Sequence, residues 1–280
     1  MAGILYLVAT PIGNLEDMTP RAVRTLREAD LIAAEDTRGS VRLLNHFDIH
    51  TPMTSYHEYN KLSKAHVLID RLLQGENVAV VTDAGTPGIS DPGEELVRMA
   101  LQNGITVSPV PGACAAVNAL VCSGKPTRRF CFEAFLPMDK KERAEILEEL
   151  KTETRTIVLY EAPHRLVRTL EELLGALGDR NITLARELTK KHETIAETTI
   201  GDALRAYREK EPRGEYVLVI EGRSRSELKR EKQDAVARSM TVEEHFQKYV
   251  SQGMDRKEAM KAVARDRGIS RREVYSQLMT

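Results

Sequence analysis

Carboxylates and basic side chains gather just after three predicted strands, where they could move a proton or hold an anion. The strands are expected at residues 31–34, 156–160 and 181–186. A carboxylate can act as a general base towards a hydroxyl group, and arginine can hold a phosphate through paired N–H donors. The sequence does not single out one base. The candidates for proton transfer are Asp36, Glu161 and Glu187, and the candidates for binding the substrate here are Arg38, His164, Arg165, Arg186 and Lys190.

Several of these residues also have a structural interpretation. Asp36 or Thr37 would cap a helix expected at about 38–46 equally well, which would leave Arg38 in solvent. A lone histidine such as His164 is more often structural than catalytic. His57 lies in a polar aromatic loop, where it could stack on a flipped-out base or equally could only cover the edge of the domain.

Three loops rich in glycine and proline each follow a predicted strand in the first half of the chain. They span residues 9–15, 83–93 and 109–113. Ligands of open α/β sheets bind outside the carboxyl ends of the strands, and glycine and proline let the backbone approach a ligand in a fixed shape. Any one loop could be an ordinary turn, but three at one sheet edge predict a pocket. The middle loop carries Asp83 and Asp91 but no basic residue, which favours a ligand with a ribose diol, an amine and a positive centre over a phosphate.

The elements that must position these loops follow from the alternation of short apolar runs with amphipathic stretches, which is typical of α/β domains. We expect an α/β domain at residues 1–122, a second at 123–222, and a basic linker with a helix-turn-helix-like tail at 223–280. The expected strands are 4–9, 31–34, 77–82 and 105–107, then 130–134, 156–160, 181–186 and 216–221, and the tail helices are 241–252, 255–267 and 270–278.

Composition and missing motifs exclude several classes of protein. The 280 residues, with 41 Lys+Arg, 42 Asp+Glu and 41% hydrophobic residues, are ordinary for a globular chain. There is no G-x-G-x-x-G after the first strand, no Walker loop, no H-E-x-x-H and no paired C-x-x-C, which argues against dinucleotide enzymes, phosphate-loop nucleotidases and zinc hydrolases. Three cysteines, no run of about 18 apolar residues and no basic start predict a soluble, cytoplasmic protein without a metal and without membrane association.

Seven segments carry a more specific pattern, and they occur in this order: residues 7–17 (LVATPIGNLED), 34–38 (AEDTR), 55–58 (SYHE), 82–93 (TDAGTPGISDPG), 160–165 (YEAPHR), 185–193 (ARELTKKHE) and 213–219 (RGEYVLV). Together they resemble the bacterial ribosomal RNA small-subunit methyltransferases of the tetrapyrrole methylase, or class III methyltransferase, superfamily. The resemblance covers about the first 222 residues.

The resemblance implies two α/β domains with S-adenosylmethionine (SAM) folded into the cleft between them, and a homodimer. It also implies 2′-O-methylation of a cytidine in the decoding region of 16S rRNA, within the 30S subunit. The residues that it places on the cofactor are Pro11, Gly13, Asp83, Ala84, Gly85, Thr86, Pro87, Ser90, Asp91, Pro92, Pro111, Gly112 and Ala113.

The tail leaves alternatives open. Residues 223–280 hold 14 lysines and arginines against 9 acidic residues, whereas residues 1–222 hold 27 against 33. Arg271 and Arg272 could meet RNA phosphates from a helix-turn-helix, or the helices could be a small packing bundle. Two rival functions also remain, namely methylation of a small tetrapyrrole and a non-catalytic metabolite sensor that binds DNA.

Overall fold

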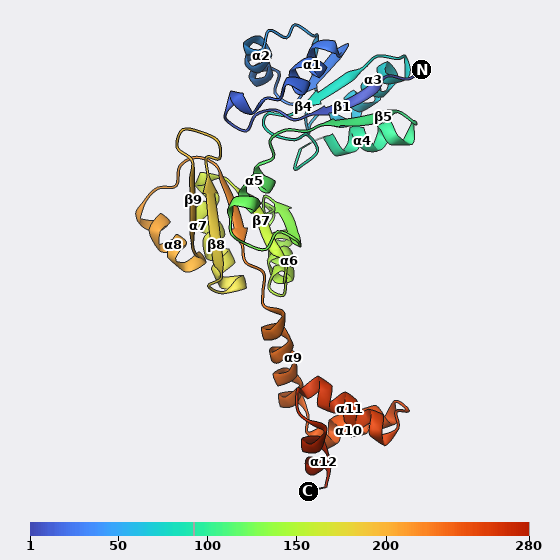
Figure 1. Cartoon of the computed structure of the whole chain (residues 1–280), viewed down its shortest axis with the longest axis vertical. Coiled ribbons are helices and arrows are strands. Elements are labelled where there is room, and N and C mark those ends of the chain that lie inside the picture. The colour runs from blue at the N-terminus through green and yellow to red at the C-terminus, as the bar shows by residue number, and fades with distance from the viewer. Residues whose placement is uncertain (92, 280) are drawn as a thin grey trace. The chain divides into compact units, whose positions relative to one another are not determined.

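The computed structural model describes residues 1–91 and 93–279, and Figure 1 traces the chain. The chain forms two compact units. The first comprises Met1–Leu147 and Thr156–Glu221, and the second comprises Glu148–Arg155 and Gly222–Thr280. Within the described residues, no helix is both long enough and apolar enough to cross a membrane. The expected boundaries after residues 122 and 222 stay predictions.

The first sheet is parallel throughout and has the strand order β3-β2-β4-β1-β5. Its central strands are short apolar runs that are buried along their whole length, as expected for a parallel sheet covered on both faces. Its strands are β1 (Ile4–Val8), β2 (Leu31–Ala34), β3 (Met53–Ser55), β4 (Val78–Val81) and β5 (Thr106–Val110). The helices between them are η1 (Leu15–Asp17), α1 (Pro20–Glu28), α2 (Thr37–His46), α3 (Lys61–Leu73) and α4 (Gly93–Gln102).

The connections from β1 and β4 leave the sheet on opposite faces. One core cluster joins the sheet to α1 and α2, and a second joins it to α3 and α4. Since β1 and β4 are neighbours, their carboxyl ends form the switch point of this sheet, which is the position where open α/β sheets bind ligands. The sheet topology therefore places the first two glycine- and proline-rich loops at a ligand-binding position.

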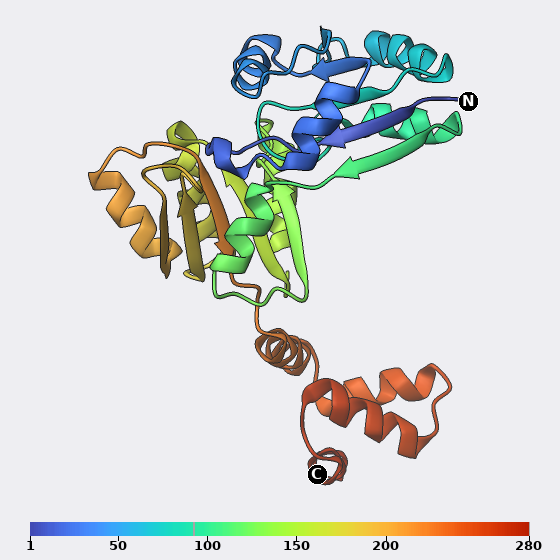
Figure 2. The same ribbon diagram turned by 45° about the horizontal axis from the view of Figure 1, so that its top comes forward.

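The second sheet is mixed and has the order β6-β7-β10-β8-β9, in which only β6 and β7 are parallel. Its strands are β6 (Phe130–Ala134), β7 (Thr156–Glu161), β8 (Asn181–Arg186), β9 (Thr194–Thr199) and β10 (Tyr216–Ile220), and its helices are α6 (Lys140–Leu150), α7 (Pro163–Leu177) and α8 (Ile200–Glu209). The preceding helix α5 (Ala115–Cys122) lies against this sheet through Ala116, Ala119 and Leu120, and Figure 2 shows it crossing the sheet face.

The second unit contains four helices with conventional termini. They are α9 (Arg225–Ser239), α10 (Val242–Ser251), α11 (Arg256–Arg267) and α12 (Arg271–Leu278). Thr241 and Ser270 form capping boxes at the starts of α10 and α12, and Gly268 ends α11 in the left-handed conformation. Val242, Phe246, Ala259, Val263 and Val274 belong to the common core of α10, α11 and α12.

The structure confirms the expected strands and tail helices to within a few residues, with three differences. The segment predicted to be a basic linker forms the helix α9, which has no apolar stripe and buries no residue. The short strand β3 and the exposed edge strand β9 lack the apolar alternation that predicts a strand. β5 runs on to Val110 through Pro109, which an edge strand tolerates because it pairs on one side only.

Candidate functional site

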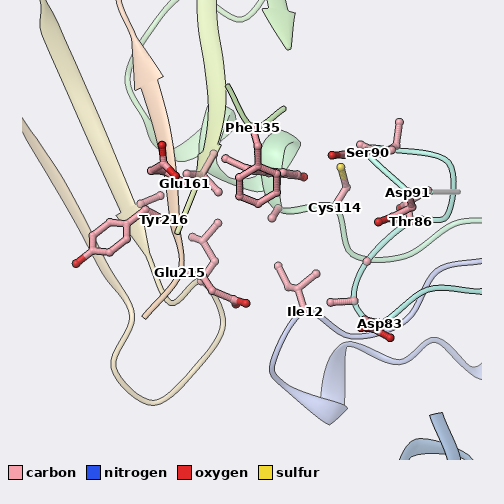
Figure 3. Close-up of a pocket in the computed structure, with 18 of the residues that line it drawn as sticks. Ile12, Asp83, Thr86, Ser90, Asp91, Cys114, Phe135, Glu161, Glu215 and Tyr216 are labelled. Carbon is pink, nitrogen blue, oxygen red and sulfur yellow. The ribbon is translucent and has the colours of Figure 1, made fainter. Parts of the chain in front are cut away.

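A cavity of about 430 Å³ lies in the first unit, between loops of the first sheet and the ends of strands in the second. Figure 3 shows Asp83, Ser90 and Asp91 on one side of it and Glu161 and Tyr216 on the other. This volume falls within the range of small-molecule sites, roughly 300–1,000 Å³.

Backbone contacts bring the three glycine- and proline-rich loops together. Thr10 and Gly85 exchange two hydrogen bonds, with N···O distances of 2.9 and 3.2 Å, and Gly85 has a φ of +84°. The Thr86 hydroxyl donates to the carbonyl of Ala113 at 3.0 Å. At Gly112 a Cβ atom would lie 2.8 Å from the Cβ of Ala9, so only glycine permits this approach.

The first-sheet wall of the cavity is acidic. Glu35, Asp83 and Asp91 all line it. Burial, together with the charges of Glu35 and Asp83, raises the pKa of Asp91 to about 6. Burial and the charge of Asp83 also raise the pKa of Glu35. Because the ionisation of Glu35 and Asp91 is disfavoured, this wall would gain from a positively charged or hydroxyl-bearing ligand.

The second-sheet wall contains a buried carboxylate, Glu161, at the end of β7. Its side chain is 1% exposed. Its Oε1 accepts the N–H of Ala162 at 2.8 Å and lies 3.6 Å from Arg165 Nε, and its Oε2 accepts the hydroxyl of Thr169 at 2.5 Å. Because one oxygen has its partner at the N-cap of α7 and the other in the second turn, Glu161 fixes this helix against the cavity.

Aromatic side chains make the rest of this wall largely apolar. Phe135 and Tyr160 line the cavity with a ring separation of 5.6 Å, and Phe132 contacts Tyr160 edge-on from behind. The Tyr160 hydroxyl accepts the N–H of Ala116 at 3.1 Å, near the start of α5. Burial raises the pKa of Tyr160 to about 12, so the phenol stays neutral.

A lysine joins the two sides of the cavity. Lys190 Nζ donates to Glu187 Oε1 at 2.9 Å and to Glu215 Oε2 at 2.8 Å, and its alkyl chain lies over Gly13, where a Cβ atom would clash with it. The hydrogen bonds from Lys190 and from the Glu215 N–H lower the pKa of Glu187. Partial burial opposes ionisation of Lys190, but the two carboxylates outweigh it and raise its pKa.

The structure brings nine of the 24 predicted site residues to the cavity. Those that line it are Asp83, Ala84, Gly85, Thr86, Ser90, Asp91, Glu161, Glu187 and Lys190. Those of the first unit that do not line it are Pro11, Gly13, Asp36, Arg38, His57, Pro87, Pro111, Gly112, Ala113, His164, Arg165 and Arg186. Pro92 lies outside the described residues, and Arg271 and Arg272 belong to the second unit.

Some predicted residues hold local structure. Asp36 caps α2 by accepting the N–H of Arg38 at 2.9 Å, and the Arg38 side chain is 88% exposed. The guanidinium groups of Arg165 and Arg186 donate to the carbonyls of Leu136 and Arg213, both at 2.6 Å. These two arginines already have partners within the fold.

Sequence reasoning missed several residues of the cavity. They include Ile12, Glu35, Cys114, Phe135, Tyr160 and Glu215. Most of them directly neighbour a predicted residue, as Glu35 neighbours Asp36. The sequence therefore located the right segments, but it did not show which of two adjacent side chains faces the cavity. Within residues 1–91 and 93–279, no cluster of three or more His, Cys, Asp or Glu residues could hold a metal ion.

Comparisons with known proteins agree on one family. The family model of the tetrapyrrole (corrin/porphyrin) methylases matches residues 4–204. A crystal structure of uroporphyrin-III-C-methyltransferase from Thermus thermophilus aligns with a TM-score of 0.55 at 23% identity, covering 78% of this chain and 94% of that one. Diphthine synthase aligns with a TM-score of 0.63 at 13% identity, covering 78% and 90%. These two structures show the fold alone.

Closer relatives narrow the assignment. Ribosomal RNA small subunit methyltransferase I of Halalkalibacterium halodurans is 50% identical over 274 residues, covering 98% of this chain and 94% of that protein. The protein of the same name from Bacillus subtilis is 49% identical over 273 residues, covering 98% and 93%. The chain belongs to the tetrapyrrole methylase family and, within it, to the group of ribosomal RNA small subunit methyltransferases I.

Proposed function

We propose that this protein transfers the methyl group of SAM to the 2′ hydroxyl of a cytidine in the decoding region of 16S rRNA, acting on the 30S subunit as a homodimer. The observation that carries the proposal is the 50% identity, over 98% of the chain, to a relative named for methylation of small-subunit rRNA. The acidic and aromatic walls of the cavity support the choice of cofactor.

The donor groups of the cavity fit SAM. Glu35, Asp83 and Asp91 suit the amine, the ribose hydroxyls and the positive sulfur, while Phe135 and Tyr160 offer an apolar surface to the adenine ring. The fixed loops at Gly85 and Gly112 would bring backbone groups close to the ligand. We propose that the predicted cofactor residues that line the cavity contact SAM directly. The others would hold the loops in the shape that binds SAM.

When bound, SAM supplies an electrophilic methyl group on a sulfonium. The chain then has to align the ribose oxygen with that group and keep water out. Alignment lowers the barrier by roughly 7–11 kcal/mol. A general base accelerates such a step about 10²–10⁴-fold, which corresponds to roughly 3–5 kcal/mol. Positioning therefore contributes more than proton transfer.

Among the candidate bases, Asp36 is the most accessible. Its side chain is 40% exposed, against 1% for Glu161 and 19% for Glu187. Its Oδ1 accepts two hydrogen bonds from Arg38, and we propose that Oδ2 accepts the proton of the hydroxyl group. The N–H of Asp36 donates to Asp83 Oδ1 at 3.1 Å, and this bond links the proposed base to the acidic wall. We propose that the exposed Arg38 beside it contacts an RNA phosphate.

The proposal is tested with purified protein and SAM labelled in the methyl group. We expect label in the 16S rRNA of unmethylated 30S subunits, and 2′-O-methylcytidine after digestion and mass spectrometry. Uroporphyrinogen III serves as the alternative acceptor, and binding of duplex DNA without any methyl transfer is the result expected of a non-catalytic sensor. Label in the porphyrin alone, or in a base instead of a ribose, would contradict the proposal.

Gly85→Val should weaken SAM binding at least tenfold, measured by calorimetry. A Cβ atom at Gly85 lies 3.3 Å from Ile12 Cγ2 in the cavity wall, and a β-branched residue is strained at a φ of +84°. Gly104→Val is the matched control. Gly104 also has a positive φ, +69°, but a Cβ atom there would meet no other atom within 4 Å, and the residue does not line the cavity. Equal SAM affinities of the two variants would show that Gly85 is not part of the SAM site.

A further inference from the structure

The second unit carries a groove along α9, where this helix packs on α11. We call it the α9–α11 groove, and its volume is about 540 Å³. Arg225, Lys229 and Lys232 line it from α9, and Arg265 and Asp266 line it from α11. Gln233 Nε2 donates to the carbonyl of Arg265 at 3.2 Å and ties the two helices together.

The groove has an excess of unpaired positive charge. Its one carboxylate, Asp266, accepts from Arg265 Nε at 2.9 Å and from the hydroxyl of Tyr249, so it is already satisfied by groups of its own bundle. Over the residues that the structure describes, Arg225, Lys229 and Lys232 have neither an ion pair nor a side-chain hydrogen bond. Three cations without partners favour an anionic occupant.

The spacing of these cations favours a chain of anions over a single one. Positions 225, 229 and 232 are four and three residues apart, so they share one face of the helix. At about 1.5 Å per residue they extend over roughly 10 Å of the helix axis. Leu228 and Val236 also line the groove and supply apolar surface beside the charges, against which the sugars and bases of a nucleic acid strand can lie.

We propose that the α9–α11 groove binds the phosphodiester backbone of the RNA substrate. This inference rests on the proposed function for the identity of the nucleic acid. It differs from the prediction for Arg271 and Arg272, which lie on α12 and outside the groove. The groove adds affinity without reading sequence, because phosphate contacts position a nucleic acid and base contacts specify it.

The test compares two triple variants of the full chain that lose the same charge. Arg225→Ala, Lys229→Ala and Lys232→Ala remove the groove cations together. Arg230→Ala, Arg238→Ala and Lys248→Ala form the control, because these three exposed cations of the same unit lie outside the groove. Alanine is the best helix former, so we expect both variants to fold, and circular dichroism on heating checks this.

Binding is measured by fluorescence anisotropy with a labelled fragment of 16S rRNA that contains the decoding region, at several salt concentrations. Each lost phosphate contact to single-stranded nucleic acid lowers the slope of log K against log salt by about 0.7. We expect the groove variant to lose about two units of slope and at least tenfold in affinity, and the control to change little. Equal changes in the two variants would show that the groove is not the binding site. Tighter binding of duplex DNA than of RNA would contradict the assignment of the occupant as RNA.

Methyl transfer distinguishes failure of this inference from failure of the proposed function. If the proposed function holds, the groove variant should show a raised KM for 30S subunits, with an unchanged kcat and an unchanged calorimetric affinity for SAM. If the wild-type protein fails to methylate the 30S subunit, the proposed function is refuted. The salt dependence of RNA binding is measured without SAM, so it still decides whether the groove binds RNA.

Discussion

Asp91→Asn should have two opposite effects, a loss of SAM affinity of about ten- to a hundredfold at pH 8 and a higher melting temperature of the protein without SAM. The affinity falls because a hydrogen bond or ion pair from a charged group is worth about 1.5–3 kcal/mol. The stability rises because burial and the nearby charges of Glu35 and Asp83 disfavour the ionised carboxylate. We expect a gain of about 2–4 °C, which corresponds to about 1 kcal/mol in a chain of this size.

The pH dependence of the same residue has a defined sign. The pKa of Asp91 is about 6 in the folded protein, above its ordinary value of 3.8, so the folded state binds the proton more tightly than the unfolded state. The contribution of Asp91 to stability is therefore favourable below about pH 4 and is lost as the pH rises through 6. SAM affinity should show the reverse trend, rising through pH 6 as the carboxylate becomes charged.

Calorimetry between pH 5 and 8 and thermal unfolding without SAM check both effects. Glu94→Gln removes a charge three residues away, from an exposed position outside the cavity, and serves as the control. We expect it to leave SAM affinity and its pH profile unchanged. A pH profile that is the same for Asp91→Asn and the wild type would show that Asp91 does not meet the cationic part of the ligand.

Glu161→Ala should destabilise the protein by about 3–5 kcal/mol, the range observed when one partner of a buried charge pair is removed. The change would leave the Thr169 hydroxyl and the Ala162 N–H without an acceptor and would leave the Arg165 guanidinium without its carboxylate. Glu145→Ala, at a largely exposed position on α6, should stay within about 0.5 kcal/mol of the wild type. Urea unfolding of each variant gives the measurement.

Glu161→Gln separates the positioning role of Glu161 from the catalytic one. The amide keeps an acceptor oxygen for Ala162 or Thr169, so we expect it to retain much of the stability that alanine loses. A positioning role predicts that kcat falls in parallel with stability, and only modestly. If kcat falls 10²–10⁴-fold while the melting temperature is nearly unchanged, Glu161 is the general base and our preference for Asp36 is wrong.

The elements around the site were largely predictable from the sequence, because their signals are local. β2 and β4 are continuous apolar runs, and both were expected at the positions where they occur. Thr241, Ser270 and Gly268 mark helix ends by their own capping chemistry. α9 and β9 were not predictable in this way, because one has no apolar stripe and the other is an exposed edge strand.

For the site itself, the sequence determined which loops and which residue types would carry a ligand, since glycine, proline and aspartate have local conformational and charge effects that need no partner. Only the tertiary structure decided that Glu35 lines the cavity while Asp36 caps a helix, and that Glu161 is buried against Thr169. It also decided that Gly13 meets Lys190. These outcomes depend on the order of the strands and on contacts between residues far apart in the chain, and neither is encoded in local spacing.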